Sequence, residues 1–123
     1  MENPELDILI EELETRTDLT VADFDGVARA LAFLLPNATG KEANLAERIG
    51  ATETAMQIAD EAFPNWIVHI HGRANDKDGH WRCTLRESDA RDDDSVIGSG
   101  RSPVLAQAVL AATMRLAMTF KNE

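Results

Sequence analysis

The chain has 123 residues and a formal net charge of −10, with 22 acidic residues against 12 Lys and Arg residues. This length is typical of one domain that buries a core without disulfides or a structural metal, and a composition of 44% hydrophobic and 28% charged residues excludes a disordered or fibrous chain. The acidic balance disfavours direct binding to nucleic acid, whose phosphate backbone requires cationic groups. We expect a single domain over 1–123, with N-terminal helices in 1–50 and an α-β-β-β-α unit in 51–123.

The first half of the chain is predicted to be helical. Asn3-Pro4 is a favourable helix start, and apolar residues then repeat at helical spacing. Thr20-Val21-Ala22-Asp23 resembles a capping box at the start of a second helix. A shorter helix is predicted over about 41–49, and Thr52 is predicted to cap another helix that ends at the next proline.

After this helix the hydrophobic period changes from near four to two, which predicts a β-hairpin over about 66–72 and 80–87 with its turn at 75–79. Strand pairing then predicts three neighbours on the inward side: Val68 with Leu85, Ile70 with Cys83, and Gly72 with Trp81. The opposite side carries a basic stripe that a partner is able to recognise by charge: His69, His71, Arg73, His80, Arg82 and Arg86.

A third short strand is predicted around Val96 and Ile97, followed by a flexible turn over 98–101. Ser102-Pro103 is predicted to begin the last helix, whose many alanines place it at the centre of the core. The predicted fold class is α+β: N-terminal helices precede an α-β-β-β-α unit with a small antiparallel sheet, in a layered α/β/α sandwich.

Several features predict a cytoplasmic protein. The single cysteine, Cys83, excludes an internal disulfide, and its inward position on a strand is that of a small buried thiol. The N-terminus is acidic and amphipathic, unlike a secretory signal. The longest apolar stretch, 104–120, contains Gln107, Thr113 and Arg115, which favours a buried helix over a membrane span.

Three segments carry a resemblance to a known family. The segment 9–35 is predicted as a short helix, a polar turn and a second helix. Phe63-Pro64-Asn65-Trp66 leads into the first strand, Trp81 lies on the next, and Ser102-Pro103-Val104-Leu105-Ala106 opens an alanine-rich helix. In these features the chain resembles the phage ABA sandwich domain family of small phage and prophage proteins. The resemblance implies a layered fold and residence in a host cell. It implies no catalytic residue, because that family has no established activity.

The α-β-β-β-α order and the turn at 98–102 are also similar to double-stranded RNA-binding domains. Those domains place lysines at the start of the final helix, where this chain has Pro103, Val104 and Gln107. Since only Arg101 is left to contact phosphate there, the likeness is one of topology, which does not transfer function.

The leading functional interpretation is a phage or prophage accessory protein that is not an enzyme, needs no cofactor and acts by protein–protein contact, as a monomer or a homodimer. Either the basic stripe or the acidic surfaces would form the contact. If the N-terminal helices cover the stripe, Glu11, Glu12 or Glu14 is expected to neutralise it within one chain or across a dimer. The acidic residues considered as a surface are Glu11, Glu12, Glu14, Asp89, Asp92, Asp93 and Asp94.

Three alternatives remain open from the sequence. The acidic surface is able to imitate a phosphate backbone, as an inhibitor of a host nucleic-acid-binding defence complex would. His69, His71 and His80 share one side of the hairpin and are able to form the three-ligand site of a zinc-dependent hydrolase, although the neighbouring arginines disfavour a dication. The chain is also a candidate for a structural component of a virion.

Overall fold

The computed structural model describes residues 4–35, 51–64, 66–72, 81–86 and 97–121. The helices of this part are α1 (Pro4–Thr15), α2 (Val21–Leu34), α5 (Thr52–Ala62) and α6 (Leu105–Lys121), and the strands are β1 (Ile67–His71), β2 (Trp81–Arg86) and β3 (Ile97–Ser102). The strands form one antiparallel sheet in the order β1-β2-β3. The predicted α+β class and α-β-β-β-α order are confirmed. The helix predicted over 41–49 and the turn at 75–79 lie outside the described residues.

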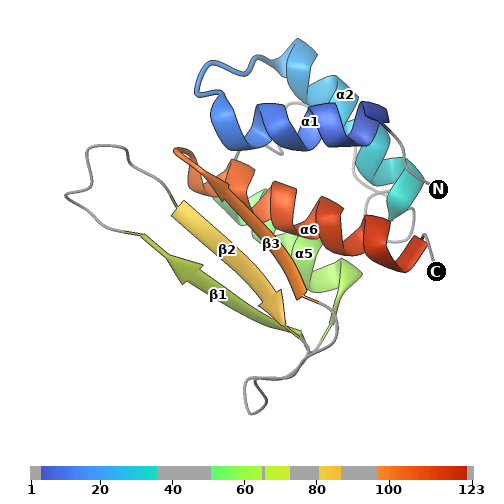
Figure 1. The fold of residues 1–123 in the computed structure, drawn as a ribbon, viewed down its shortest axis with the longest axis vertical. Coiled ribbons are helices and arrows are strands. Elements are labelled where there is room, and N and C mark those ends of the chain that lie inside the picture. Colours follow the sequence, from blue (N-terminus) through green and yellow to red (C-terminus); the bar gives the residue numbers. More distant parts are fainter. Residues whose placement is uncertain (1–3, 36–50, 65, 73–80, 87–96, 122–123) are drawn as a thin grey trace.

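Helix α6 lies at the centre of the molecule, as the sequence predicted (Figure 1). It packs against β2 and β3 on one side and against α5, α1 and α2 on the others. Every residue from Ala106 to Met114 is buried, because helices and sheet surround this segment. In the described part of the chain, none of the helices is long and apolar enough to cross a lipid bilayer.

The N-terminal helices lie beside α6 and the β3 edge of the sheet. Helix α1 contacts α6, β3 and α2, and α2 contacts α6 and α1. Figure 1 shows the described helices gathered on one side of the sheet. The described N-terminal helices therefore do not cover the histidine-bearing side of the hairpin, a point that the sequence left open.

The inward face of the hairpin has the predicted register. Val68 lies opposite Leu85, and Ile70 lies opposite Cys83. The Cys83 side chain is fully buried, and this burial raises the pKa of its thiol to about 11. Both tryptophans pack against the same hydrophobic core, and a β-carbon on Gly72 would lie within 3 Å of the Trp81 ring. Exposure alternates along β2 as predicted, whereas along β1 it does not, because Ile70 on the inward side is 37% exposed.

Strand β3 includes the segment predicted to be a flexible turn, so that prediction is wrong. Residues 98–101 pair with β2 in an antiparallel ladder. Gly98 and Gly100 turn toward α6, and a β-carbon on Gly100 would lie 2.5 Å from both the Ala108 carbonyl oxygen and the Ala112 nitrogen. The glycines therefore allow close approach of strand and helix backbones, rather than a turn.

Two helix starts differ from their predictions. Helix α6 begins at Leu105, because Ser102 belongs to β3; the Ser102 hydroxyl accepts a hydrogen bond from the Val104 N–H at 3.1 Å. Helix α5 begins at Thr52, with Ala51 at the N-cap and no side-chain cap. Thr52 therefore occupies the first helical position instead of the cap.

The capping box of α2 is confirmed. The Thr20 hydroxyl accepts from the Asp23 N–H at 3.3 Å, and the Thr20 N–H donates to the Asp23 carboxylate at 3.0 Å. This hydrogen bond from the backbone is the main reason that the pKa of Asp23 is lower than its ordinary value. The reciprocal pair satisfies two amides at the helix start and orients α2 for packing on α6.

Candidate functional site

The side of the sheet turned away from α6 is here called the outer face. Alternation along β1, β2 and β3 assigns to it these described residues: Ile67, His69, His71, Arg82, Thr84, Arg86, Ser99 and Arg101. This group contains no Asp or Glu, although the whole chain has 22 acidic residues. The outer face is therefore a basic surface on a strongly acidic protein.

Three of these residues lie in one line across the strands, and we call them the basic row. His71 of β1 is the register partner of Arg82 of β2, which is in turn the partner of Arg101 of β3. All three are exposed. Neither Arg82 nor Arg101 forms an ion pair with a carboxylate within the described residues. Like charges directly opposite each other on adjacent strands destabilise a sheet, by about 0.2 to 1 kcal/mol per pair.

The free edge of β3, next to the basic row, is closed by an ion pair between α1 and α6. The Arg115 guanidinium donates to both oxygens of the Glu14 carboxylate, at 2.5 and 2.7 Å. The same carboxylate accepts from the Arg101 N–H at 3.1 Å, and Arg115 also donates to the Ser99 carbonyl at 3.0 Å. Two backbone groups that would otherwise lack partners on this edge are thus satisfied by side chains.

We expect removal of this ion pair to loosen α1 from the sheet edge. The Glu14 side chain is only 15% exposed, so Arg115→Ala leaves a mostly buried carboxylate without its guanidinium. The free energy of unfolding should fall by about 1 to 3 kcal/mol. Chemical denaturation of Arg115→Ala, Glu14→Gln and the variant with both substitutions measures the coupling energy between Glu14 and Arg115.

Arg29→Ala is the matched control for this measurement. Its partner is Asp25, and the two side chains are 82% and 51% exposed. Loss of such a surface pair should change stability by less than about 0.5 kcal/mol. Equal losses for Arg115→Ala and Arg29→Ala would show that the Glu14–Arg115 pair does not hold the edge.

A shallow hollow of about 350 Å³ lies where the basic row meets this ion pair. It is lined by Glu14, Arg82, Ser99, Gly100, Arg101 and Arg115. Three guanidinium groups and one carboxylate give these walls a formal charge of +2. Since the Glu14 carboxylate is already bound by Arg115, the hollow presents two cationic groups to an incoming anion.

The structure brings together four of the six residues predicted for the basic stripe. His69, His71, Arg82 and Arg86 share the outer face. Arg73 and His80 lie outside the described residues, as do four members of the predicted acidic surface: Asp89, Asp92, Asp93 and Asp94. Glu11 and Glu12 lie on α1, away from β1 and β2.

The Glu14 carboxylate pairs with Arg115, which is not a residue of the predicted stripe. The pairing follows from the position of α1, which runs beside α6 and the β3 edge. The sequence did not predict that Arg101 joins the basic side chains of the hairpin, because a turn was predicted there. The alternation of Gly98, Ser99, Gly100 and Arg101 was the available signal of a strand, and the lone charge of Arg115 in an apolar helix was the signal of a buried partner.

Two of the three histidines proposed as zinc ligands, His69 and His71, belong to the described residues. The rings of His69 and His71 are stacked, with centroids 6.2 Å apart and planes 5° apart. Among the described residues, no group of three His, Cys, Asp or Glu side chains has the arrangement of a metal site. The zinc hydrolase hypothesis therefore draws no support from this part of the chain.

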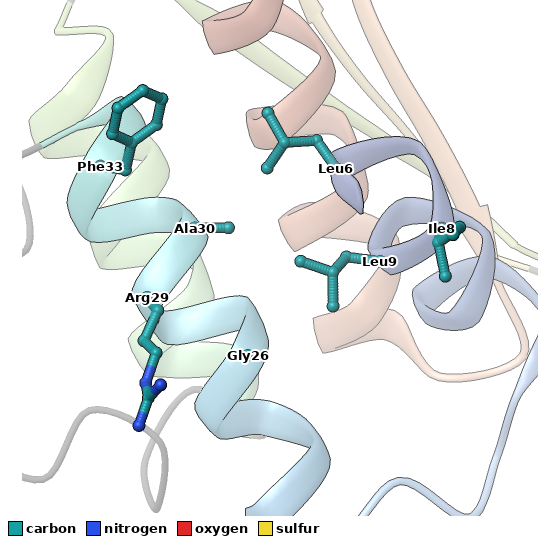
Figure 2. Close-up of a pocket in the computed structure, with 7 residues that line it drawn as sticks. All are labelled: Leu6, Ile8, Leu9, Gly26, Arg29, Ala30 and Phe33. Atoms are coloured by element: carbon teal, nitrogen blue, oxygen red, sulfur yellow. The ribbon is translucent and has the colours of Figure 1, made fainter. Parts of the chain in front are cut away.

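A second hollow, of about 560 Å³, lies between α1 and α2 and is mainly apolar (Figure 2). Leu6 and Leu9 of α1 point toward Ala30 of α2, whereas Ile8 and Arg29 point away from the gap. Its lining includes one ionisable side chain, Arg29, which pairs with Asp25. This hollow offers hydrocarbon contact and no acid–base or nucleophilic chemistry.

No family model, curated protein or solved structure shows a significant match to this chain.

Proposed function

We propose that this protein is a binding protein without enzymatic activity, and that its outer face binds an acidic segment of another protein. The basic row carries this proposal. Its two arginines repel each other in the free protein, and carboxylates from a partner would relieve that repulsion through charge-assisted hydrogen bonds. Setting two exposed guanidinium groups side by side has a cost in stability, which a role in binding would explain.

The net charge of −10 does not prevent such binding. At physiological ionic strength the Debye length is about 8 Å, so distant acidic residues are largely screened from a partner at the outer face. The local charge of the basic row then decides the sign of the contact, while the acidic remainder of the surface restricts the partner to this face. A role as a phage or prophage accessory protein, as the family resemblance implies, stays a prediction alongside this proposal.

Charge reversal on the outer face tests the proposal. We expect a fluorescently labelled Glu-rich peptide to bind the wild-type protein in a fluorescence anisotropy titration at physiological ionic strength. Arg82→Glu and Arg101→Glu should each weaken binding by about tenfold or more. Arg29→Glu introduces the same charge change at an exposed position on α2 and should leave the affinity nearly unchanged.

Stability provides a second readout of the same variants. The R101E variant places a carboxylate opposite Arg82, so repulsion across the strands is replaced by attraction. Its free energy of unfolding should therefore rise by about 0.5 to 1 kcal/mol while peptide binding is lost. No binding by the wild-type protein, or equal weakening by Arg29→Glu, would overturn the proposal.

A further inference from the structure

The geometry of the basic row specifies the shape of the partner as well as its charge. The row crosses the sheet at one register position on each strand, through His71, Arg82 and Arg101. Neighbouring strands are about 4.8 Å apart, so the three side chains leave the sheet at steps of about 5 Å along a line perpendicular to the strands. A partner that engages all three must present carboxylates at a similar spacing along one line.

An α-helix meets this requirement. Side chains three and four positions apart on a helix lie on one face with their β-carbons about 5 to 6 Å apart, close to the step of the basic row. An extended strand repeats the same face every second residue, at about 6.6 Å, and loses alignment with the row over three residues. The spacing therefore favours a helix that lies across the strands.

The edge of the sheet supports the same conclusion. An extended peptide commonly binds by adding a strand to an open sheet edge. On the β3 side, however, the Glu14 carboxylate accepts from the Arg101 N–H and the Arg115 guanidinium donates to the Ser99 carbonyl. Strand addition beside Arg101 is therefore blocked, so a partner at the β3 end of the basic row contacts it from above the outer face.

We infer that the partner segment is an acidic α-helix whose carboxylates at positions i, i+3 or i+4, and i+7 pair with the basic row. The helix axis runs perpendicular to the strands. Its carboxylates near Arg82 and Arg101 enter the hollow between the row and the Glu14–Arg115 pair. This inference rests on the proposed function and adds the conformation and orientation of the bound segment.

Two Ala-based peptides of about 18 residues and identical composition test the inference. In the first, three Glu residues at i, i+4 and i+7 share one face; in the second, Glu residues at i, i+5 and i+10 point in different directions. Circular dichroism establishes that both are equally helical, and anisotropy titrations measure their affinities for the full chain. We expect the first peptide to bind about tenfold more tightly, and Arg82→Glu and Arg101→Glu to remove that difference.

The possible results separate the inference from the proposed function. Equal affinity for both peptides would overturn the helix inference and leave the proposed function standing. Binding of neither peptide, nor of a flexible Glu-rich peptide, would overturn both. Tighter binding of a DNA duplex than of either peptide at the same salt concentration would also overturn both, because the basic row would then be a phosphate-binding surface.

Discussion

We expect Gly100→Ala to be strongly destabilising, although it adds a single methyl group. A β-carbon at this position would lie 2.5 Å from the Ala108 carbonyl oxygen and the Ala112 nitrogen, and 2.8 Å from the Ala111 β-carbon. Two of these three atoms belong to the backbone of α6, so no change of rotamer relieves the contact. Strand and helix must move apart, and the core between them opens. The free energy of unfolding should fall by about 3 kcal/mol, and the Tm by roughly 10 °C.

Ser99→Ala is the matched control, since Ser99 is the neighbouring residue of the same strand and is exposed on the outer face. Its substitution should change the free energy of unfolding by less than about 0.5 kcal/mol. Thermal and chemical denaturation of both variants make the comparison. A Gly100→Ala protein as stable as the Ser99→Ala protein would mean that β3 does not pack against α6 as closely as the structure shows.

The second large effect is expected for Gln107→Leu, which replaces the amide by an apolar side chain of similar volume. The Gln107 side chain is buried, and its Nε2 donates to the Leu13 carbonyl at 2.8 Å and to the Arg16 carbonyl at 2.7 Å. These carbonyls lie at the C-terminal end of α1, where helix geometry leaves them without partners in the helix. Gln107→Leu removes both hydrogen bonds while the carbonyls stay shielded from water. The expected loss is about 2 to 3 kcal/mol.

Gln57→Leu makes the same chemical change at an exposed position on α5, where the side chain has one long hydrogen bond, of 3.5 Å, to Glu61. It should leave stability within about 0.5 kcal/mol of the wild type. Hydrogen exchange gives a second test, because the amides of α1 should lose more protection in Gln107→Leu than those of α5. Equal effects of the two substitutions would show that Gln107 does not cap the C-terminal end of α1.

Sequence patterns over a few residues predicted the structure correctly where the decisive contacts join neighbouring residues. The capping box of Thr20 and Asp23 follows from their spacing of three. Strand alternation placed both tryptophans on the core side, and pairing predicted Val68 opposite Leu85. For the candidate site, the same alternation brought four basic side chains of β1 and β2 to one face.

The same patterns gave wrong or incomplete predictions where the decisive contacts join residues far apart in the sequence. Gly98 and Gly100 are typical of a turn until α6 is placed against them, when they become the residues that permit a strand. Arg101 could join the basic row only after this strand was known. The sequence also left open whether N-terminal helices cover the outer face.

By itself, then, the sequence determined the element types, the register of the hairpin and the two-sided character of its strands, since periodicity and capping act within a few residues. Only the tertiary structure decided that α1 and α2 pack on α6, that Glu14 binds Arg115, and that the amide of Gln107 ends α1. The physical reason is that these contacts join residues 91 to 101 positions apart. Such contacts depend on how the helices and the sheet pack together to bury apolar surface, and a sequence pattern over a few residues does not predict this packing.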